Sequence, residues 1–98
     1  GGITDNLPRV LPQGTAAVVD CSTWQVPAIF EWLHRSGDVP IEDMLRTFNM
    51  GIGMILVADA GQKEQILEEL AARGGQNAQV IGEVVAAADM PQVIYTNL

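Results

Sequence analysis

The stretch Thr-Ala-Ala-Val-Val-Asp at residues 15–20 is a short apolar run that is rich in β-branched side chains. It lies between Gly14 and the turn-forming pair Ser22-Thr23. An apolar run this short, bounded by turn residues, predicts a buried strand and not a helix. We therefore expect a sheet built around residues 15–20, and the neighbouring segments decide what covers it.

The segment before this strand, residues 1–12, leaves little room for regular structure. It opens with two glycines, continues with three residues that favour helix caps (Thr4 to Asn6), and carries Pro8 and Pro12. Because proline interrupts helical hydrogen bonding, one or two helical turns are the most that fit here. We expect a loop that contains one short helix.

Two helices are predicted after the strand. Pro27 suits a first turn and Gly37 is a natural stop, so residues 27–35 are expected to form the first helix. The second begins after Asp38, with Pro40 in its first turn. Its apolar side chains are spaced at i, i+3, i+4 and i+7, as one helix face requires; they are Ile41, Met44, Leu45 and Phe48.

The next segment alternates between strand and helix signals. Residues 55–58, Ile-Leu-Val-Ala, form a continuous apolar run that is typical of a strand covered on both faces. Asp59 and Gln62 then fit the spacing of a helix cap, and the helix is expected to end at Gly74-Gly75. Its apolar face consists of Ile66, Leu67, Leu70 and Ala71.

Two further strands, residues 79–86 and 92–96, are expected to close the chain. Gly82 lies inside the first of them and indicates a bulge or a close approach of another backbone. The order of elements predicts an α/β or α+β domain in which helices pack on a sheet. Four strands are few for strands that look buried on both faces. We therefore expect a sheet that residues preceding Gly1 or another chain would complete.

Composition limits the possible functions of the chain. It has 98 residues, a formal net charge of −7 and Lys63 as its single lysine. Such a chain has no basic patch for nucleic acid and is repelled by an acidic membrane surface.

Cys21 has no partner for an internal disulfide, which favours a reducing, cytosolic location. No apolar run is long enough to span a membrane. The start at Gly1-Gly2 without a methionine suggests a piece of a longer protein.

Most residues that could carry chemistry have an ordinary structural interpretation. His34 lacks a second ligand at metal-binding spacing and is expected at the surface near a helix end. Cys21 has no basic neighbour in sequence that would lower its pKa. Trp24 and Trp32 fit core or interface anchors. The acidic side chains Glu64, Glu68 and Glu69 fit a solvated helix face.

Two glycine-bearing segments are the better candidates for a binding site. Gly1-Gly2 precedes the cap residues, so backbone N–H groups could face an anion, although an ordinary helix-capping turn explains the same residues. Residues 49–54, Asn-Met-Gly-Ile-Gly-Met, could bring bare backbone against a ligand, although a tight turn from helix to strand also accounts for them. Arg9 is one of five basic residues and would contribute either a ligand contact or a structural salt bridge.

The chain resembles the aminoimidazole ribonucleotide synthetase family, also called phosphoribosylformylglycinamidine cyclo-ligases. Four blocks carry the resemblance in order: Gly-Gly-Ile-Thr-Asp-Asn-Leu-Pro-Arg-Val-Leu-Pro at 1–12, Trp-x-x-Pro-x-Ile-Phe-x-Trp-Leu at 24–33, Arg-Thr-Phe-Asn-Met-Gly-Ile-Gly-Met at 46–54 and Val-Ile-Gly-Glu-Val at 80–84. They cover essentially the whole chain, which is expected to be the later part of the carboxy-terminal domain. The resemblance implies a layered α/β/α unit with a mixed sheet.

The resemblance implies an ATP-dependent ring closure in purine biosynthesis. Formylglycinamidine ribonucleotide would become aminoimidazole ribonucleotide, with ATP and Mg2+ required and ADP and phosphate released. The family's enzymes are cytosolic homodimers of two-domain subunits with the active site in a cleft between the domains. Much of the ATP-binding machinery belongs to the amino-terminal domain, so this chain alone is expected to be inactive.

The resemblance also marks residues for substrate or phosphate contacts and for shaping the cleft. They are Gly1, Gly2, Asn6, Arg9, Asn49, Gly51 and Gly53. Two departures stand out, because the family usually has three glycines where this chain has two, and Asp5 stands where Glu is commoner. The catalytic base and the metal ligands are not indicated. The alternative interpretation is a free-standing, non-catalytic binding or assembly module with the same fold.

Overall fold

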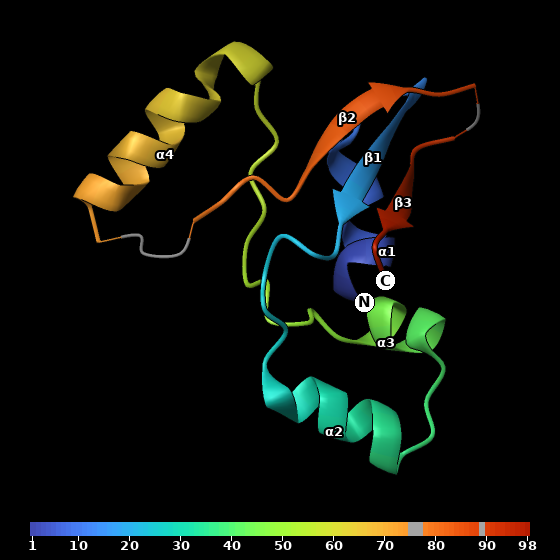
Figure 1. Ribbon diagram of the computed structural model, residues 1–98. Coiled ribbons are helices and arrows are strands. Elements are labelled where there is room, and N and C mark those ends of the chain that lie inside the picture. Colours follow the sequence, from blue (N-terminus) through green and yellow to red (C-terminus); the bar gives the residue numbers. More distant parts are fainter. Residues whose placement is uncertain (75–77, 89) are drawn as a thin grey trace.

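A mixed sheet of three strands organises the molecule in the computed structural model, which describes residues 1–74, 78–88 and 90–98. The strands are β1 (Thr15–Asp20), β2 (Gly82–Ala86) and β3 (Gln92–Thr96), in the order β2-β1-β3 (Figure 1). β2 is antiparallel to β1 and places Val84 opposite Ala17. β3 is parallel to β1 and places Val93 opposite the same Ala17. β1 is therefore the central strand, and β2 and β3 form the two edges.

The helices are short and fall into three groups. α1 and η1 follow one another and pack against β3, α2 and α3 form a pair, and η2 leads directly into α4 (Figure 1). Their bounds are α1 Gly2–Asn6, η1 Leu7–Val10, α2 Ala28–Ser36, α3 Ile41–Thr47, η2 Ala60–Gln62 and α4 Lys63–Ala72.

Two clusters of buried side chains hold these elements together. The first joins α1, η1 and β1 and consists of Ile3, Leu7, Leu11, Ala17 and Val19. The second surrounds α3 and consists of Met44, Leu45 and Met50. Trp24 and Tyr95 pack against both clusters, so they link the sheet to the α2–α3 pair. α4 contributes no buried residue to either cluster.

Most of the predicted elements are confirmed. β1 and β3 have the predicted bounds, and the helices predicted at 27–35 and after Asp38 appear as α2 and α3. The short amino-terminal helix is present as α1 followed by η1. The α+β class and the mixed sheet are confirmed, and the completion of the sheet by other residues stays a prediction. The predicted helix end at Gly75 lies outside the described residues.

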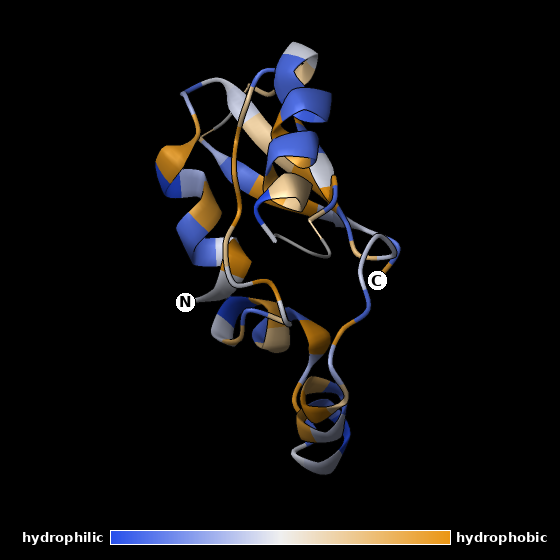
Figure 2. Cartoon of the chain, turned by 90° about the vertical axis from the view of Figure 1, so that its left-hand side faces the viewer, coloured by the Kyte–Doolittle hydropathy of each residue, from blue (hydrophilic) through white to orange (hydrophobic). Residues whose placement is uncertain are grey.

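The strand predicted at residues 55–58 is wrong. This segment is assigned neither strand nor helix, and Figure 2 shows it without a strand arrow. It pairs with none of the three strands of the sheet, and the central strand β1 already has a neighbour on each side. Leu56 and Val57 are exposed, at 59% and 45%, whereas Ile55 is half-buried against the first cluster. The predicted cap also fails, because the Asp59 side chain makes no capping hydrogen bond.

The other closing strand is shorter than predicted, since β2 begins at Gly82 and not at residue 79. It is also not covered on both faces, because only Val85 among its residues is half-buried. The predicted close approach at Gly82 is confirmed. A Cβ atom at this position would collide with the backbone carbonyl oxygen of Val18 on β1. Glycine is therefore required here by the spacing of the two strands.

None of the helices in the described ranges reaches the length and apolarity needed to cross a membrane.

Candidate functional site

Of the two glycines at the start of the chain, Gly2 lies against the carboxyl end of α3, whereas Gly1 lies beside Asp5 and Asn6 of its own helix. Gly2 has a positive φ of 62°. A Cβ atom on it would lie 2.5 Å from the carbonyl oxygen of Leu45 and 2.7 Å from that of Phe48. Position 2 therefore requires glycine for two reasons, the positive φ and the close approach to the carbonyl oxygens of Leu45 and Phe48. The contact brings the first candidate segment next to Asn49, where the second one begins.

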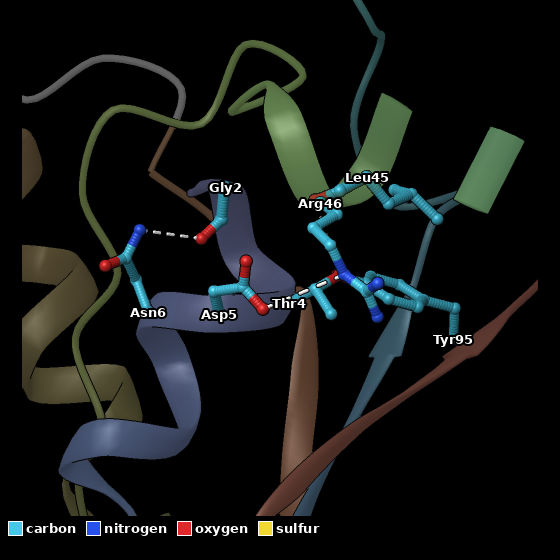
Figure 3. A network of polar contacts seen from close by, with 7 residues as sticks. All are labelled: Gly2, Thr4, Asp5, Asn6, Leu45, Arg46 and Tyr95. Carbon is cyan, nitrogen blue, oxygen red and sulfur yellow. Dashed lines mark hydrogen bonds and ion pairs between the residues drawn. The ribbon is translucent and has the colours of Figure 1, made fainter. Parts of the chain in front are cut away.

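Hydroxyl groups fix this arrangement (Figure 3). The Thr4 hydroxyl donates to the carbonyl oxygen of Leu45 over 3.3 Å, and its oxygen lies 2.7 Å from the Tyr95 hydroxyl. One side chain on α1 thus connects α3 and β3. Burial raises the pKa of Tyr95 above its usual value, and the hydrogen bond to Thr4 opposes that shift only in part. The phenol is thus a neutral hydrogen-bonding group.

A charged pair adds a second link between the same helices. The guanidinium of Arg46 on α3 lies 3.8 Å from the carboxylate of Asp5 on α1 (Figure 3). Both side chains are well exposed, so this pair contributes little to stability on its own. Asp5 is the position at which the resemblance noted in the sequence leads us to expect Glu. The shorter side chain still reaches the basic residue across the helix pair.

The second candidate segment forms a tight turn directly after α3. Asn49 accepts a hydrogen bond from the backbone N–H of Gly51 through its side-chain oxygen, over 2.8 Å. Met50 and Gly51 both have positive φ, at 56° and 96°. The indole N–H of Trp24 donates to the Met50 carbonyl over 3.1 Å and anchors the turn to the core. The Asn49 oxygen thus shapes the turn, and its amide nitrogen takes no part in this bond.

The two glycines of this segment differ in their surroundings. A Cβ atom on Gly51 would lie 2.5 Å from the ring of Pro27, so packing and a positive φ both require glycine there. Gly53 has neither requirement, because no atom lies within 4 Å of a Cβ built on it and its φ is not positive. Packing within the described chain therefore explains Gly51 but leaves Gly53 without a structural reason.

Asn6 and Arg9 complete the candidate residues. Asn6 donates from its side-chain amide to the carbonyl oxygen of Gly2 over 2.9 Å, which closes the first turn of α1 (Figure 3). Arg9 lies on η1, where it is exposed and forms no ion pair with any of the described residues. The structural salt bridge considered for Arg9 is therefore not seen in this part of the chain.

The structure thus brings some of the candidates together and leaves others apart. Gly1 and Gly2 lie at the start of α1, the side chain of Asn6 at its end bonds back to Gly2, and Gly2 touches the backbone that leads into Asn49. Among the described residues, no side-chain hydrogen bond or ion pair joins Arg9 or Gly53 to this group. Sequence reasoning missed Tyr95, and it treated Thr4 only as a cap residue. Neither residue carries a sequence signal for this bond, because they are separated by 91 positions.

The remaining reactive side chains have structural roles. His34 bonds through its ring nitrogen to the carbonyl oxygen of Val39 at 2.5 Å, next to the end of α2. Burial, with a smaller contribution from the Asp20 carboxylate, raises the pKa of the Cys21 thiol. This lowers its thiolate fraction and its nucleophilicity. Trp24 is a core anchor as predicted, whereas Trp32 is 60% exposed.

Asp20 shows the opposite shift. Hydrogen bonds from the side chains of Ser22 and Asn97, and from the Ser22 backbone, lower the pKa of its carboxyl group. Asp20 is therefore a carboxylate at neutral pH and joins the ends of β1 and β3.

In residues 1–74, 78–88 and 90–98, no three His, Cys, Asp or Glu side chains gather in a way that could hold a metal ion. We therefore assign no metal-binding role to any of them.

The site offers backbone N–H groups, side-chain amides, hydroxyls and the guanidinium of Arg46, and the guanidinium of Arg9 lies on η1. These groups can bind and orient an anionic or polar ligand.

Comparison with known families agrees with the motifs, since residues 1–91 match the family described as AIR synthase related protein, C-terminal domain. The chain belongs to this family. The matched range contains the whole of the candidate site.

Individual relatives support the same assignment. The chain is 48% identical over 97 residues to a protein of Coxiella burnetii named phosphoribosylformylglycinamidine cyclo-ligase, which covers 98% of the chain and 27% of that relative. A protein of the same name from Chromobacterium violaceum is 49% identical, over 86% of the chain and 24% of the relative. The bifunctional purine biosynthetic protein PUR2,5 of Pichia angusta is 42% identical, over 99% of the chain and 12% of its own length. The chain thus spans about a quarter of its bacterial relatives.

Proposed function

We propose that this chain is part of a phosphoribosylformylglycinamidine cyclo-ligase. Such an enzyme converts formylglycinamidine ribonucleotide into aminoimidazole ribonucleotide and consumes ATP. The observation that carries the proposal is the family match over residues 1–91. It is supported by the meeting of the two glycine-bearing segments at the end of α3, where Gly2 touches the carbonyl of Phe48. The proposal includes a cytoplasmic location and a homodimer.

The role proposed for this chain is to bind and not to perform the chemical steps. Arg9 has a free guanidinium among the described residues, and guanidinium groups match phosphate oxygens in charge and shape. The Gly1-Gly2 backbone and the amides of Asn6 and Asn49 would orient the polar parts of the same ligand. Gly53 would let its backbone approach the ligand closely, which gives this unexplained glycine a reason.

Other parts of the cyclo-ligase would supply the rest of the reaction. ATP would provide the phosphoryl group that activates the formyl oxygen. An amidine nitrogen would then attack the formyl carbon, which bears that oxygen. Mg2+ would neutralise the phosphate charge. No residue of this chain is given a role in holding the ion, because no suitable ligand cluster occurs in its described part.

Calorimetric titration tests the binding role. The 98-residue chain is titrated with formylglycinamidine ribonucleotide and, separately, with Mg-ATP. At least one ligand should bind, and Arg9→Ala should weaken that binding roughly tenfold or more, as expected when a charge-assisted hydrogen bond is lost. Arg73→Ala is the matched control, because it removes an equally exposed arginine just after α4. It should leave the affinity unchanged.

Two results would contradict this assignment. Equal affinity in the wild-type chain and in Arg9→Ala would remove Arg9 from the site. Turnover of formylglycinamidine ribonucleotide and ATP by the 98 residues alone would show that the catalytic groups lie within this chain, against the role proposed here.

A further inference from the structure

The feature that the proposed function leaves unused is a line of hydrogen bonds from β3 through α1 to the end of α3 (Figure 3). The Tyr95 hydroxyl lies 2.7 Å from the Thr4 hydroxyl, which in turn donates to the carbonyl oxygen of Leu45 over 3.3 Å. We call these three groups the hydroxyl bridge. Both of its bonds are partly buried, and they join elements that are far apart in the sequence. The bridge lies where the two glycine-bearing segments meet.

The protons of the hydroxyl bridge have one defined direction. A hydroxyl group has a single proton, and Thr4 uses its proton for the bond to Leu45. Tyr95 must therefore donate to the Thr4 oxygen. Burial raises the pKa of Tyr95, which keeps that proton in place at neutral pH. The orientation of the Thr4 hydroxyl is thus fixed by Tyr95 on one side and by Leu45 on the other.

The Leu45 carbonyl is the point at which α1 is attached to α3. It is one of the last four carbonyls of α3, which have no partner within the helix. The carbonyl of Met44, one residue earlier, accepts from the N–H of Phe48 beyond the helix end. The Thr4 hydroxyl provides the donor for Leu45, and a Cβ atom on Gly2 would lie 2.5 Å from the same oxygen. One carbonyl thus meets both the backbone of Gly2 and the side chain of Thr4.

The other polar contacts of α1 cannot replace this attachment. Among the described residues, the only other polar side-chain contact from α1 to α3 or β3 is the exposed pair of Asp5 and Arg46 at 3.8 Å, and such pairs contribute little. The bond from Asn6 to Gly2 lies within α1 itself. The Tyr95 ring packs against both buried clusters, so the hydroxyl bridge ties the start of α1 to the core.

We infer that Thr4 and Tyr95 are positioning residues of the candidate ligand site. They hold the Gly1-Gly2 backbone at a fixed place relative to the turn at Asn49, which begins four residues after Leu45. A shift of α1 on α3 would change the spacing of the two segments. Groups that bind one ligand together lose affinity when their spacing changes, because their hydrogen bonds no longer have good geometry. The inference rests on the proposed function, since it concerns the same ligand site.

Calorimetric titration with formylglycinamidine ribonucleotide and, separately, with Mg-ATP tests this inference. Thr4→Val removes the hydroxyl at nearly constant shape, and Tyr95→Phe keeps the packed ring. Each should raise the dissociation constant of the ligand that the wild-type chain binds roughly fivefold or more, as expected when a partly buried hydrogen bond is lost. The double variant should bind about as weakly as Thr4→Val, because both changes break the same bridge. Thr4→Ser keeps the hydroxyl and should restore affinity to within about twofold of the wild type.

The matched control is Thr15→Val, which removes a threonine hydroxyl that likewise donates to a backbone carbonyl, that of Pro12. Thr15 begins β1, and its hydroxyl bond involves none of the candidate residues. The control should leave the affinity unchanged. Circular dichroism at the titration temperature shows whether each variant is folded, and Tyr95→Phe carries the test if Thr4→Val does not fold.

The outcomes separate the inference from the proposed function. Unchanged affinity in Thr4→Val and Tyr95→Phe, in a chain whose wild type binds, would overturn the inference and leave the proposed function standing. An equal loss in Thr4→Ser or in Thr15→Val would also overturn it, because the effect would then not depend on the hydroxyl bridge. A wild-type chain that binds neither ligand would contradict the binding role itself, and the inference would fall with it.

Discussion

The half of the molecule built on β1, β3, α1 and α3 differs sharply from the half built on α4. In the first half, Val19 is 2% exposed and Met44 is fully buried, and hydroxyl groups join three elements. In the second half, α4 has no buried residue and the segment before it is open to solvent. Both α3 and α4 carry apolar side chains at helical spacing. The difference shows that an apolar helix face forms a core only when another surface lies against it.

The largest predicted effect is the difference in the free energy of unfolding between two leucine-to-alanine variants, one in each half. Leu45→Ala on α3 removes a side chain that is 4% exposed, and it should lower the free energy of unfolding by about 3 kcal/mol. Leu70→Ala on α4 removes a half-buried side chain that packs against neither buried cluster of the described chain, and it should cost below about 1 kcal/mol. Urea unfolding at a concentration where the chain is monomeric measures both. Equal losses would mean that α4 is packed as firmly as α3.

A second pair compares two glycines. Gly82→Ala forces a methyl group on the edge strand β2 against the Val18 carbonyl of β1, and it should destabilise the chain by about 2 kcal/mol. Gly61→Ala lies in η2, where no atom is within 4 Å of the new methyl group. It should be neutral or stabilising by about 0.5 kcal/mol. Thermal and urea unfolding both report this difference, and a tolerated Gly82→Ala would contradict the strand spacing.

The smallest effect concerns pH and the ends of β1 and β3. The pKa of Asp20 in the folded chain lies below its ordinary value of 3.8. Its contribution to stability is therefore complete above the unfolded-state pKa and is lost as the pH falls through the lower folded-state pKa. The urea midpoint of the wild-type chain should fall more than that of Asp20→Asn on acidification from about pH 5 to pH 2. Parallel curves for the two proteins would show that Asp20 does not link these strands.

Local sequence signals predicted the elements that pack against each other within the chain. Residues 15–20 formed a strand because both of its neighbours are present, and Met44 and Leu45 were buried as their helical spacing predicts. Residues 55–58 carry an equally strong strand signal but pair with none of the three strands. The apolar residues of a segment predict that it is buried. Whether another element lies against it depends on the rest of the fold.

The candidate site shows the same division between local and long-range information. Glycine at positions 2 and 51 could be tied to turns from the sequence, and the structure gives both a positive φ. The bond between Thr4 and Tyr95 could not be predicted, because it depends on how α1 docks against β3. The contact roles of Arg9, Asn49 and Gly53 remain predictions that ligand binding must test.

Amide hydrogen exchange of the monomeric chain tests the contrast between the two halves most directly. We predict that amides of β1 and α3 exchange only through global unfolding, whereas amides of α4 exchange through local opening at a clearly lower free energy. This follows because α4 lacks a packed partner in the described chain. Protection of α4 equal to that of β1 would contradict the account.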